Sequence, residues 1–428
     1  MNQIKKILRH KAFFAFCGIP MSIPFFLMGQ ENPLGWNIPY FLVLYVISFL
    51  AYLLALYSTW NRELEKKEIL YLFLIALLCQ VFLLFQEASL STDIYRYLWD
   101  GHILNQGINP YLEPPNSPKL ARFDTSYSYL INHPYLRTIY PPLSQMAFGG
   151  VAFFSSSQWG MKVFFIFFSM ATLTLLLLFL KLKSLPLQRC LIYGWNPLVL
   201  LEFGHSGHLD SLAIFFMVLG LYLWEKGKTM QGAAGLSLSC SAKLFTFQAL
   251  PWWIAKKRRK EILLFLGILF LTYLPFAGAG KYLFTTLFAY GKRWVFNSPT
   301  FSIAIYFLGH DQLYRLFLLI LFFAFCIYQG IKQDGLMEYF YTILAFALIF
   351  NHTLLPWYFI WIIPFLCFYP NRGWILLTGT LALSYWVVGV YLHTGDWVLS
   401  PYIMALEYTI PYSLMIWDWW KGRRKEGL

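Results

Sequence analysis

The chain has 428 residues, of which 59% are hydrophobic, 21% aromatic and only 12% charged, and its mean hydropathy is +0.55. This composition excludes a soluble globular domain and indicates an integral membrane protein. The net charge of +13 does not indicate nucleic acid as a partner, because the basic residues stand in short clusters between apolar runs, as in cytoplasmic loops beside membrane lipids.

Apolar runs of roughly 15 to 22 residues recur along the whole chain, close to the ~20 residues that a helix needs to cross a bilayer. Because every backbone polar group needs an internal partner in lipid, these runs predict helices. We therefore expect an all-α polytopic membrane protein, a bundle of about 12–14 transmembrane helices. No linker or change of composition divides the chain, so residues 1–428 are expected to form a single transmembrane domain.

Basic clusters at both ends of the chain predict that both termini lie in the cytoplasm. They comprise Lys5, Lys6, Arg9 and Lys11 at the start and Lys421, Arg423, Arg424 and Lys425 at the end. The first apolar run, residues 12–29, has no small-residue cleavage site after it and is expected to be retained. With further crossings at residues 38–59 and 69–86, the long loop 87–142 is predicted to be extracytoplasmic.

The next segment, residues 143–157, is apolar but short. Counting it as a crossing would place the basic residues beyond position 180 outside, so it is predicted to be a re-entrant or interfacial helix. Residues 161–182 then form the return crossing. The remaining predicted crossings lie near residues 189–203, 209–225, 230–242, 244–255, 261–277, 312–330, 336–351, 356–370, 373–391 and 402–419.

The external loop begins with two carboxylates, Asp93 and Asp100, among aromatic residues and one arginine. Acidic groups at a membrane edge are costly and indicate catalytic or ion-handling sites, although a lone aspartate there could simply be solvated. If the segment is helical, both carboxylates lie on one face with Arg96 and Tyr97 between them. Asp93 and Asp100 are therefore candidate catalytic residues, and Arg96 could set the charge state of a general base or hold an anionic group.

Proline-rich turns accompany Tyr111 and Tyr140, which either belong to the loop scaffold or line a sugar-binding surface. Residues 204–210 are predicted to form a second outer loop and contain His205, His208 and Asp210. Two histidines and a carboxylate could bind a metal ion, but the spacing is not a strong zinc signature. A polar substrate or a phosphate is the favoured ligand, and no metal site is expected.

Lys243 lies between two apolar half-segments, residues 230–242 and 244–255, where a lysine rarely serves packing. On its C-terminal side, the only acidic residue within twenty positions is Glu261, at the predicted cytoplasmic edge. An anionic lipid head group is therefore the expected partner of Lys243, although a lysine nearer a helix end would extend to the interface.

Three cations, Lys292, Arg293 and His352, stand on the predicted outer side, against the usual charge bias. They form a second candidate clamp for a phosphate group. Tyr358 lies in the same predicted outer loop as His352 and is a candidate substrate-binding residue. For such a single aromatic residue, membership of the interfacial aromatic belt is the simpler explanation.

Taken together, these motifs resemble the GT-C superfamily of membrane glycosyltransferases. They are most similar to the bacterial polyprenyl-phosphate-mannose-dependent mannosyltransferases, and more distantly to the catalytic subunit of the first GPI mannosyltransferase. The motifs follow the family's order and comprise Asp93-x-x-Arg96-Tyr97-x-Trp99-Asp100-Gly101, Gly107-x-Asn109-Pro110-Tyr111, Tyr140-Pro141-Pro142, Asn196-Pro197-Leu198 with His208-x-Asp210, Lys243 followed by Pro251, Trp294-x-x-Asn297 and Pro356-Trp357-Tyr358.

In that superfamily the leading aspartate of the first long external loop is the catalytic residue, which by resemblance is Asp93. Two positions depart from the family pattern. Tyr95 stands where eukaryotic relatives have the second aspartate of an Asp-x-Asp, and Leu209 stands where many bacterial members have asparagine.

The resemblance implies an inverting glycosyltransferase of GT-C type in the cytoplasmic (inner) membrane, with its active site facing outward. It would move a hexose, by resemblance mannose, from a polyprenyl-phosphate sugar donor to a lipid- or glycan-linked acceptor. A lipid-phosphate leaving group requires no cofactor, and a divalent cation is allowed but not needed. The alternative is a transporter or flippase of lipid-linked sugars, for which an inverted repeat would be expected, and none is visible. A polysaccharide polymerase or ligase would carry a larger outer domain.

Overall fold

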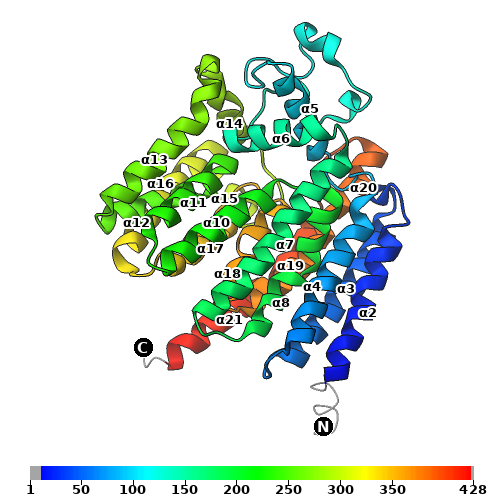
Figure 1. Ribbon diagram of the computed structural model, residues 1–428, viewed down its shortest axis with the longest axis vertical. Helices are drawn as coiled ribbons and strands as arrows, with labels where there is room; N and C mark the ends of the chain where they lie inside the picture. Colours follow the sequence, from blue (N-terminus) through cyan, green and yellow to red (C-terminus); the bar gives the residue numbers. More distant parts are fainter. Residues whose placement is uncertain (1–10, 426–428) are drawn as a thin grey trace.

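The computed structural model describes residues 11–425 and is built from helices joined by turns and one long loop (Figure 1). Within these residues, strand pairing is limited to an isolated bridge between Phe296 and Thr353. The prediction of an all-α fold is confirmed. Most of the predicted basic clusters lie outside the described part, namely Lys5, Lys6 and Arg9 and the side chains of Lys11, Arg423, Arg424 and Lys425.

Six helices of the described chain are long and apolar enough to cross a membrane, as a polytopic membrane protein requires. They are Ile38–Thr59 (α3), Lys66–Leu84 (α4), Gln158–Leu182 (α7), Arg259–Ala279 (α13 with η7), Asp311–Lys332 (α16) and Arg372–Thr394 (α19 to α20). Shorter apolar helices are Phe13–Met28 within α2 (Lys11–Met28), Pro299–Leu308 (α15) and Leu336–Phe350 (α17). Fewer helices than the predicted 12–14 therefore run unbroken over a membrane's width.

Several other predicted crossings are interrupted helices. They are η4 (Leu187–Cys190), α8 (Leu191–Gly194), α9 (Pro197–Leu201) and the π-helical turn η5 (Glu202–Ser206), then η6 (Leu244–Gln248) with α12 (Ala249–Ala255), and η8 (Pro356–Trp361) with α18 (Ile363–Leu366). Proline begins α9 and η8, where its missing N–H costs no hydrogen bond within the helix. Irregular backbone at membrane depth must be shielded by protein, and α8, α9 and η5 are buried throughout.

The hairpin of α10 (Asp210–Glu225) and α11 (Thr229–Ala242) packs closely because glycines line its contact. A Cβ atom on Gly220 would lie 2.8 Å from the backbone nitrogen of Leu236, and one on Gly232 would lie 2.8 Å from the carbonyl oxygen of Gly220. This hairpin also packs on α7, so the first residue of α10 is held firmly at the end of the bundle.

Two helices lie crosswise at one end of the bundle, α5 (Asp93–Asn105) and α6 (Pro142–Phe154), and the described termini lie at the opposite end (Figure 1). They touch closely at Gly101, where a Cβ atom would clash with the carbonyl oxygen of Phe148. Helix α6 matches the predicted short helix 143–157, and its crosswise course suits an interfacial position. The loop between the two helices holds η2 (Pro118–Phe123) and η3 (Ser128–Leu130).

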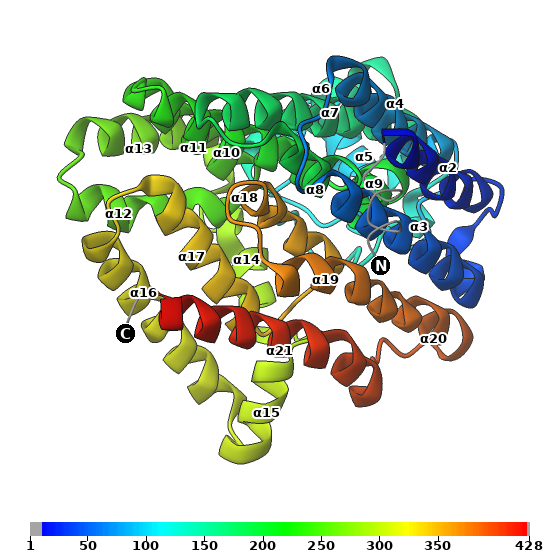
Figure 2. The ribbon, with the colours of Figure 1, turned by 90° about the horizontal axis from the view of Figure 1, so that it is seen from below.

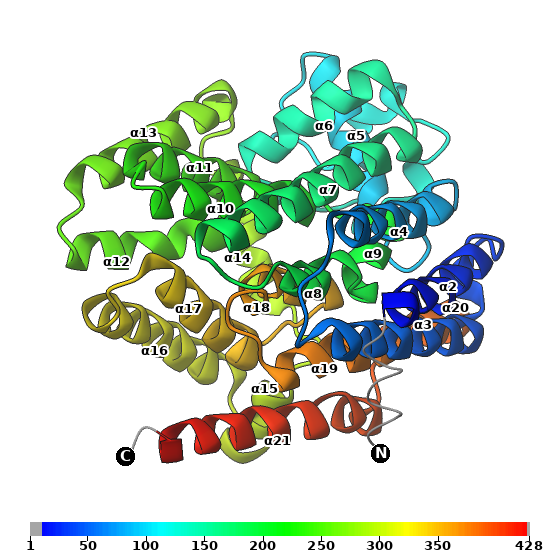
Figure 3. The ribbon, with the colours of Figure 1, turned by 60° about the horizontal axis from the view of Figure 1, so that its bottom comes forward.

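The second half of the chain completes the bundle. Helix α21 lies along α19, as the views from below and from a tilted angle show (Figures 2 and 3). Helix α14 lies at the same end as α5 and α6 (Figure 1). The remaining bounds are η1 (Leu34–Trp36), α13 (Arg259–Tyr273), η7 (Leu274–Ala279), α14 (Tyr282–Arg293), α19 (Arg372–Thr380), η9 (Leu381–Tyr385), α20 (Trp386–Thr394) and α21 (Pro401–Lys425).

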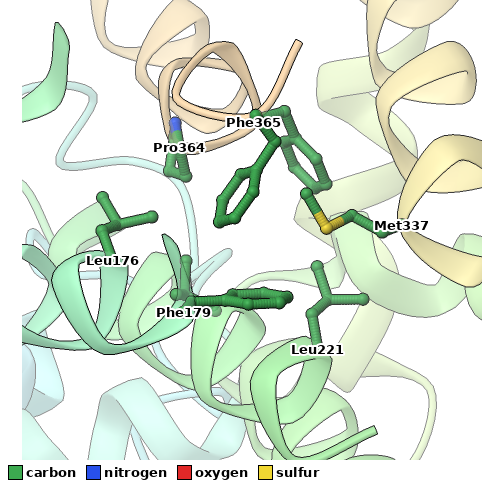
Figure 4. Close-up of a pocket in the computed structure, with 8 residues that line it drawn as sticks. Leu176, Phe179, Leu221, Met337, Pro364 and Phe365 are labelled. Atoms are coloured by element: carbon green, nitrogen blue, oxygen red, sulfur yellow. The ribbon is translucent and has the colours of Figure 1, made fainter. Parts of the chain in front are cut away.

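A small pocket inside the bundle is lined by apolar side chains (Figure 4). Its lining consists of Leu176, Phe179, Val218, Leu221, Met337, Pro364, Phe365 and Phe368. These side chains offer no strong hydrogen-bond donor or charge to a sugar or a phosphate. The polar chemistry of the protein must therefore be sought elsewhere, at the end of the bundle that carries α5 and α6.

Candidate functional site

Asp93 is the first residue of α5, where the positive end of the helix dipole stabilises a carboxylate. Its side chain is 21% exposed, so solvent and a substrate can reach the carboxylate. One of its oxygens, Oδ1, accepts a hydrogen bond from the Asn132 amide at 2.7 Å. The loop between α5 and α6 thus fixes the orientation of the carboxylate and leaves Oδ2 for other partners.

The second oxygen of Asp93 faces His208. Nδ1 of the imidazole lies 3.9 Å from Oδ2 of Asp93 and 3.4 Å from the hydroxyl of Tyr97. On the other side of the ring, Nε2 lies 3.2 Å from Oε2 of Glu202, and both side chains are fully buried. Trp357 stacks on the imidazole at 4.1 Å between ring centroids. One imidazole therefore stands between two carboxylates from different helices.

A second polar cluster begins at Asp210, the first residue of α10. Its Oδ1 accepts from the Lys243 ammonium at 2.6 Å and from the Trp361 indole at 2.5 Å. The ammonium also lies 4.9 Å from the ring centre of Tyr358 and 5.1 Å from that of Trp361. The Tyr358 hydroxyl in turn lies 2.7 Å from that of Tyr290 in α14. These contacts place an aromatic-walled cation near the histidine cluster, since His208 and Asp210 are only two positions apart in the chain.

The electrostatics connect the two clusters. Burial raises the pKa of the Tyr97 hydroxyl well above its usual value, and the charges of Asp93 and Asp210 add to this effect. Burial likewise raises the pKa of Tyr290, with a contribution from Asp93. Both phenols therefore remain protonated hydrogen-bond donors at neutral pH, and both lie within the field of the Asp93 carboxylate.

The segment before α5 is anchored by groups behind it. The Lys162 ammonium of α7 donates to the Gln86 carbonyl at 2.6 Å, which suits a cation at the end of α4. The His205 ring accepts from the Ser89 backbone N–H at 3.2 Å and lies 3.1 Å from the Gln86 side chain. His205 is fully buried and holds the segment that leads to Asp93, so its predicted contact with substrate stays a prediction.

Asp100 and Arg96 have structural partners in the folded chain. This differs from the expectation that Asp100 is catalytic and that Arg96 serves the base or an anionic group. They form an ion pair at 2.8 Å and are almost completely buried. Asp100 accepts a second hydrogen bond from Gln145 of α6 at 3.0 Å, and Arg96 donates to the Leu136 carbonyl at 2.9 Å. The pair joins α5, α6 and the loop between them, so Asp100 is not placed to take a proton from an acceptor.

Of the two candidate tyrosines of the loop, Tyr111 is a scaffold residue. The Tyr111 hydroxyl donates to the Tyr140 carbonyl at 2.6 Å, and the Tyr111 ring is buried against Phe276. Tyr140 packs edge-on against the Tyr97 ring at 4.9 Å between centroids. The sequence offered both a scaffold and a sugar surface, and for Tyr111 the structure favours the scaffold.

Lys243 differs from the prediction in one respect, because its acidic partner is Asp210, far away in the sequence. Sequence spacing does not reveal this partner, because the α10–α11 hairpin brings together two residues that are 33 positions apart. The ammonium still has free donors, since Lys carries three and its side chain is 21% exposed.

Among the predicted outer cations, the structure changes the expectation for His352, while the role of Lys292 and Arg293 in a phosphate clamp stays a prediction. Lys292 and Arg293 are exposed at the end of α14. His352 donates from Nε2 to the Gly291 carbonyl at 2.9 Å, and burial, the largest effect, lowers its pKa below the usual value. His352 is therefore neutral at pH 7 and supplies a hydrogen-bond donor to the backbone, not a positive charge for a phosphate.

Four residues contact the candidate site without having been predicted from the sequence, namely Glu202, Asn132, Tyr290 and Trp361. A signal existed for Glu202, because it is a carboxylate in a predicted crossing, and such residues indicate function by default. Nothing in the loop sequence distinguished Asn132. Tyr290 and Trp361 were hidden among the many aromatic residues expected of a membrane protein.

The residues of the 204–210 segment do not converge on a common point. His205 faces Gln86 and Ser89, whereas His208 faces Asp93 and Glu202. Throughout the part of the chain that the structure describes, no group of three or more His, Cys, Asp or Glu residues is arranged to hold a metal ion. The alternative of a metal set at these residues finds no support in their geometry.

Comparison with known proteins gives one match. The family model described as alpha-(1->6)-mannopyranosyltransferase, N-terminal domain, of the MptA/B family, matches residues 36–256. No curated protein and no solved structure matches the chain. The matched segment covers Asp93, the η5 turn, both residues His208 and Asp210, and Lys243.

Proposed function

Because the chain belongs to the MptA/B family of alpha-(1->6)-mannopyranosyltransferases, and is thus a membrane glycosyltransferase, we propose its donor, acceptor and orientation. The donor is a polyprenyl-phosphate sugar, and the sugar is mannose. The acceptor is a lipid- or glycan-linked sugar at the outer face of the cytoplasmic membrane. The observation that carries the proposal is Asp93, a reachable carboxylate that is held by Asn132 and connected through Tyr290 and Tyr358 to an aromatic-walled cation.

Asp93 serves as the general base. An acceptor hydroxyl is a poor nucleophile, and a carboxylate within reach can take its proton as the new glycosidic bond forms. Oδ1 is occupied by the Asn132 amide, so Oδ2 receives the proton. A single displacement inverts the anomeric carbon, so the α-product in the family's description requires a β-linked donor.

Lys243 holds the departing phosphate. One of its N–H groups is used by Asp210, and the remaining donors are available to a phosphate oxygen. The Tyr358 and Trp361 rings beside the ammonium exclude water and strengthen its interaction with an anion. Because a lipid phosphate leaves more readily than an alkoxide, this charge suffices and no metal ion is required.

The outward orientation is supported by charge and arrangement. The described termini lie at the end opposite α5 and α6 (Figure 1), and the basic clusters predict that the termini are cytoplasmic. Asp93 then faces the outside, where lipid-linked sugars serve as donors in the absence of nucleotide sugars.

The test is sugar transfer by the purified protein in lipid nanodiscs. Radiolabelled mannosyl-phosphoryl-decaprenol is the donor and an alkyl α-mannoside is the acceptor. We expect a labelled α-linked disaccharide product that GDP-mannose cannot replace as donor. Transfer from GDP-mannose, or no transfer while the lipid-linked donor is moved between leaflets, would refute the proposal in favour of a nucleotide-sugar enzyme or a flippase.

A further inference from the structure

Behind His208 lies a buried carboxylate that the mechanism above does not use. Glu202 is fully buried, at the first position of the π-helical turn η5. Neither of its oxygens has a hydrogen-bond partner of good geometry among the described residues, and its ion-pair contact is with Nε2 of His208 at 3.2 Å. A buried carboxylate without other partners is costly, so its presence there calls for a role.

The local backbone directs Glu202 toward the imidazole. The Glu202 carbonyl accepts from the His208 backbone N–H at 3.0 Å, which closes a turn around both residues. Gly207 ends the turn with φ +64°, and a side chain there would meet Ile94 of α5. Gly204 approaches the backbone of Gln80 so closely that a Cβ atom would lie 2.9 Å from its Cα. The turn is therefore built tightly between α4 and α5.

The neighbours of the ring define where its proton lies. Tyr97 remains protonated, and its hydroxyl lies 3.4 Å from Nδ1, where it can donate to the ring. With Nδ1 as acceptor, the neutral imidazole carries its proton on Nε2, which lies 3.2 Å from Oε2 of Glu202 without forming a hydrogen bond of good geometry. A negative charge this close to Nε2 favours the tautomer that leaves Nδ1, on the side of Asp93, available to receive a proton.

We propose that Glu202 is a positioning residue that holds His208 ready to accept the proton from Asp93. The acceptor oxygen forms its bond to the anomeric carbon, and the bond from this carbon to the phosphate oxygen breaks, with its electron pair leaving on the phosphate. The hydroxyl proton passes to Oδ2 of Asp93 and then to Nδ1 of His208. Glu202 balances the charge of the resulting imidazolium, which later releases the proton to water or to the departing phosphate.

The distance of 3.9 Å between Asp93 and His208 suits this sequence, because catalytic hydrogen bonds are often long before substrate binds. The charged and titratable groups near the ring are Asp93 and Tyr97 of α5, Glu202 and His205 of η5, and Asp210 of α10. Among these, Glu202 is the residue whose substitution removes a negative charge next to Nε2 and leaves the base itself intact.

The experiment rests on the proposed function and uses the full chain in nanodiscs with labelled mannosyl-phosphoryl-decaprenol and an alkyl α-mannoside. The kcat and KM of wild type, Glu202→Gln and Glu202→Asp are measured from pH 5 to pH 9. Glu261→Gln is the matched control, because Glu261 is also a buried glutamate but lies at the start of α13 beside Arg258. Size-exclusion profiles establish that each variant is folded.

We expect Glu202→Gln to lower kcat about 10- to 100-fold with donor KM changed less than about twofold, since general acid–base help is worth about 10²- to 10⁴-fold in total. The acid limb of its kcat profile should move down by about one pH unit, because the charge that favours a protonated ring is gone. Glu202→Asp should recover much of kcat and the original limb, and Glu261→Gln should match wild type.

Equal losses in Glu202→Gln and Glu202→Asp with an unmoved acid limb would overturn the proposal and leave Glu202 a packing residue. If Glu202→Gln does not fold, Glu202→Asp decides, since a folded Glu202→Asp protein that keeps the carboxylate but recovers neither kcat nor the original limb would equally overturn the relay. Absence of transfer in wild type is a different result, because it refutes the proposed function itself and the relay falls with it.

Discussion

The two aspartates of α5 are expected to fail in different ways when each is replaced by asparagine. Asp100 is 2% exposed at its side chain and lies 2.8 Å from Arg96, which is 6% exposed. At an effective dielectric constant of about 20, two unit charges at that distance attract by about 6 kcal/mol before desolvation is counted. Asp100→Asn leaves the Arg96 charge buried without its counter-ion, which costs about 3–5 kcal/mol.

That loss is a large fraction of the roughly 5–15 kcal/mol that stabilises a typical folded protein. Asparagine has a single acceptor oxygen, so either Arg96 or Gln145 also loses its hydrogen bond. We therefore expect Asp100→Asn to lower the yield and the thermal stability of the protein. The fraction that remains folded should transfer sugar at a rate within about fivefold of wild type, since Asp100 does not meet the acceptor.

The assay pairs two measurements on the same preparation. Thermal stability is followed by the amount of monodisperse protein on size exclusion after heating, and the transfer rate is expressed per mole of folded protein. The double variant Arg96→Gln, Asp100→Asn is the control, because it removes the buried charge and should be more stable than Asp100→Asn alone. A variant Asp100→Asn as stable as wild type but slowed by two orders of magnitude would refute this reasoning and make Asp100 the base.

Four further outcomes follow from the same geometry. Asp93→Asn should fold normally, since its side chain is partly exposed and Asn132 can still donate to the remaining oxygen, while kcat falls about 10²- to 10⁴-fold; near-normal turnover would exclude Asp93 as the base. Lys243→Met should raise the apparent KM for the lipid donor at least tenfold in a folded protein, and an unchanged donor KM with poor folding would instead mean that the Lys243–Asp210 pair is purely structural. In a cysteine-free variant, Lys119→Cys should react with a membrane-impermeant maleimide only from outside, and labelling only from the cytoplasm would overturn the orientation. Transfer should persist in EDTA, because the leaving group is a phosphate and Lys243 supplies the charge; loss of activity that Mn²⁺ or Mg²⁺ restores would contradict this.

The sequence predicted the class of fold and pointed to Asp93 as the leading candidate residue, in both cases for clear physical reasons. Apolar runs predict membrane helices strongly, because a bilayer leaves the backbone few alternatives. Asp93 stood out since a carboxylate at the edge of such a run has few innocuous explanations. The short helix before α7 was also visible, because its length and the charges after it excluded an ordinary crossing.

What the sequence could not supply was the pairing between distant residues. Lys243 looked unpartnered along the chain, yet the α10–α11 hairpin places Asp210 next to it. His205 and His208 are three residues apart and appeared equivalent, but the π-helical turn points one at the segment before α5 and the other at Asp93. Asp93 and Asp100 likewise share a helix, and only the packing of α6 separates a reachable carboxylate from a buried ion pair.

The π-helical turn from Glu202 to Ser206 also has a consequence for how this lineage can change. Such a turn accommodates one residue more than an α-helical turn, and the His208 N–H closes it on the Glu202 carbonyl, so removing one residue there would break this spacing. His208 would swing away from Asp93, and Asp210 would leave the start of α10 where Lys243 meets it. A substitution changes one side chain, whereas a deletion in this turn changes the position of every residue that follows it. The length of this turn is therefore constrained, and we expect a homologue with a deletion here to have lost the transferase activity.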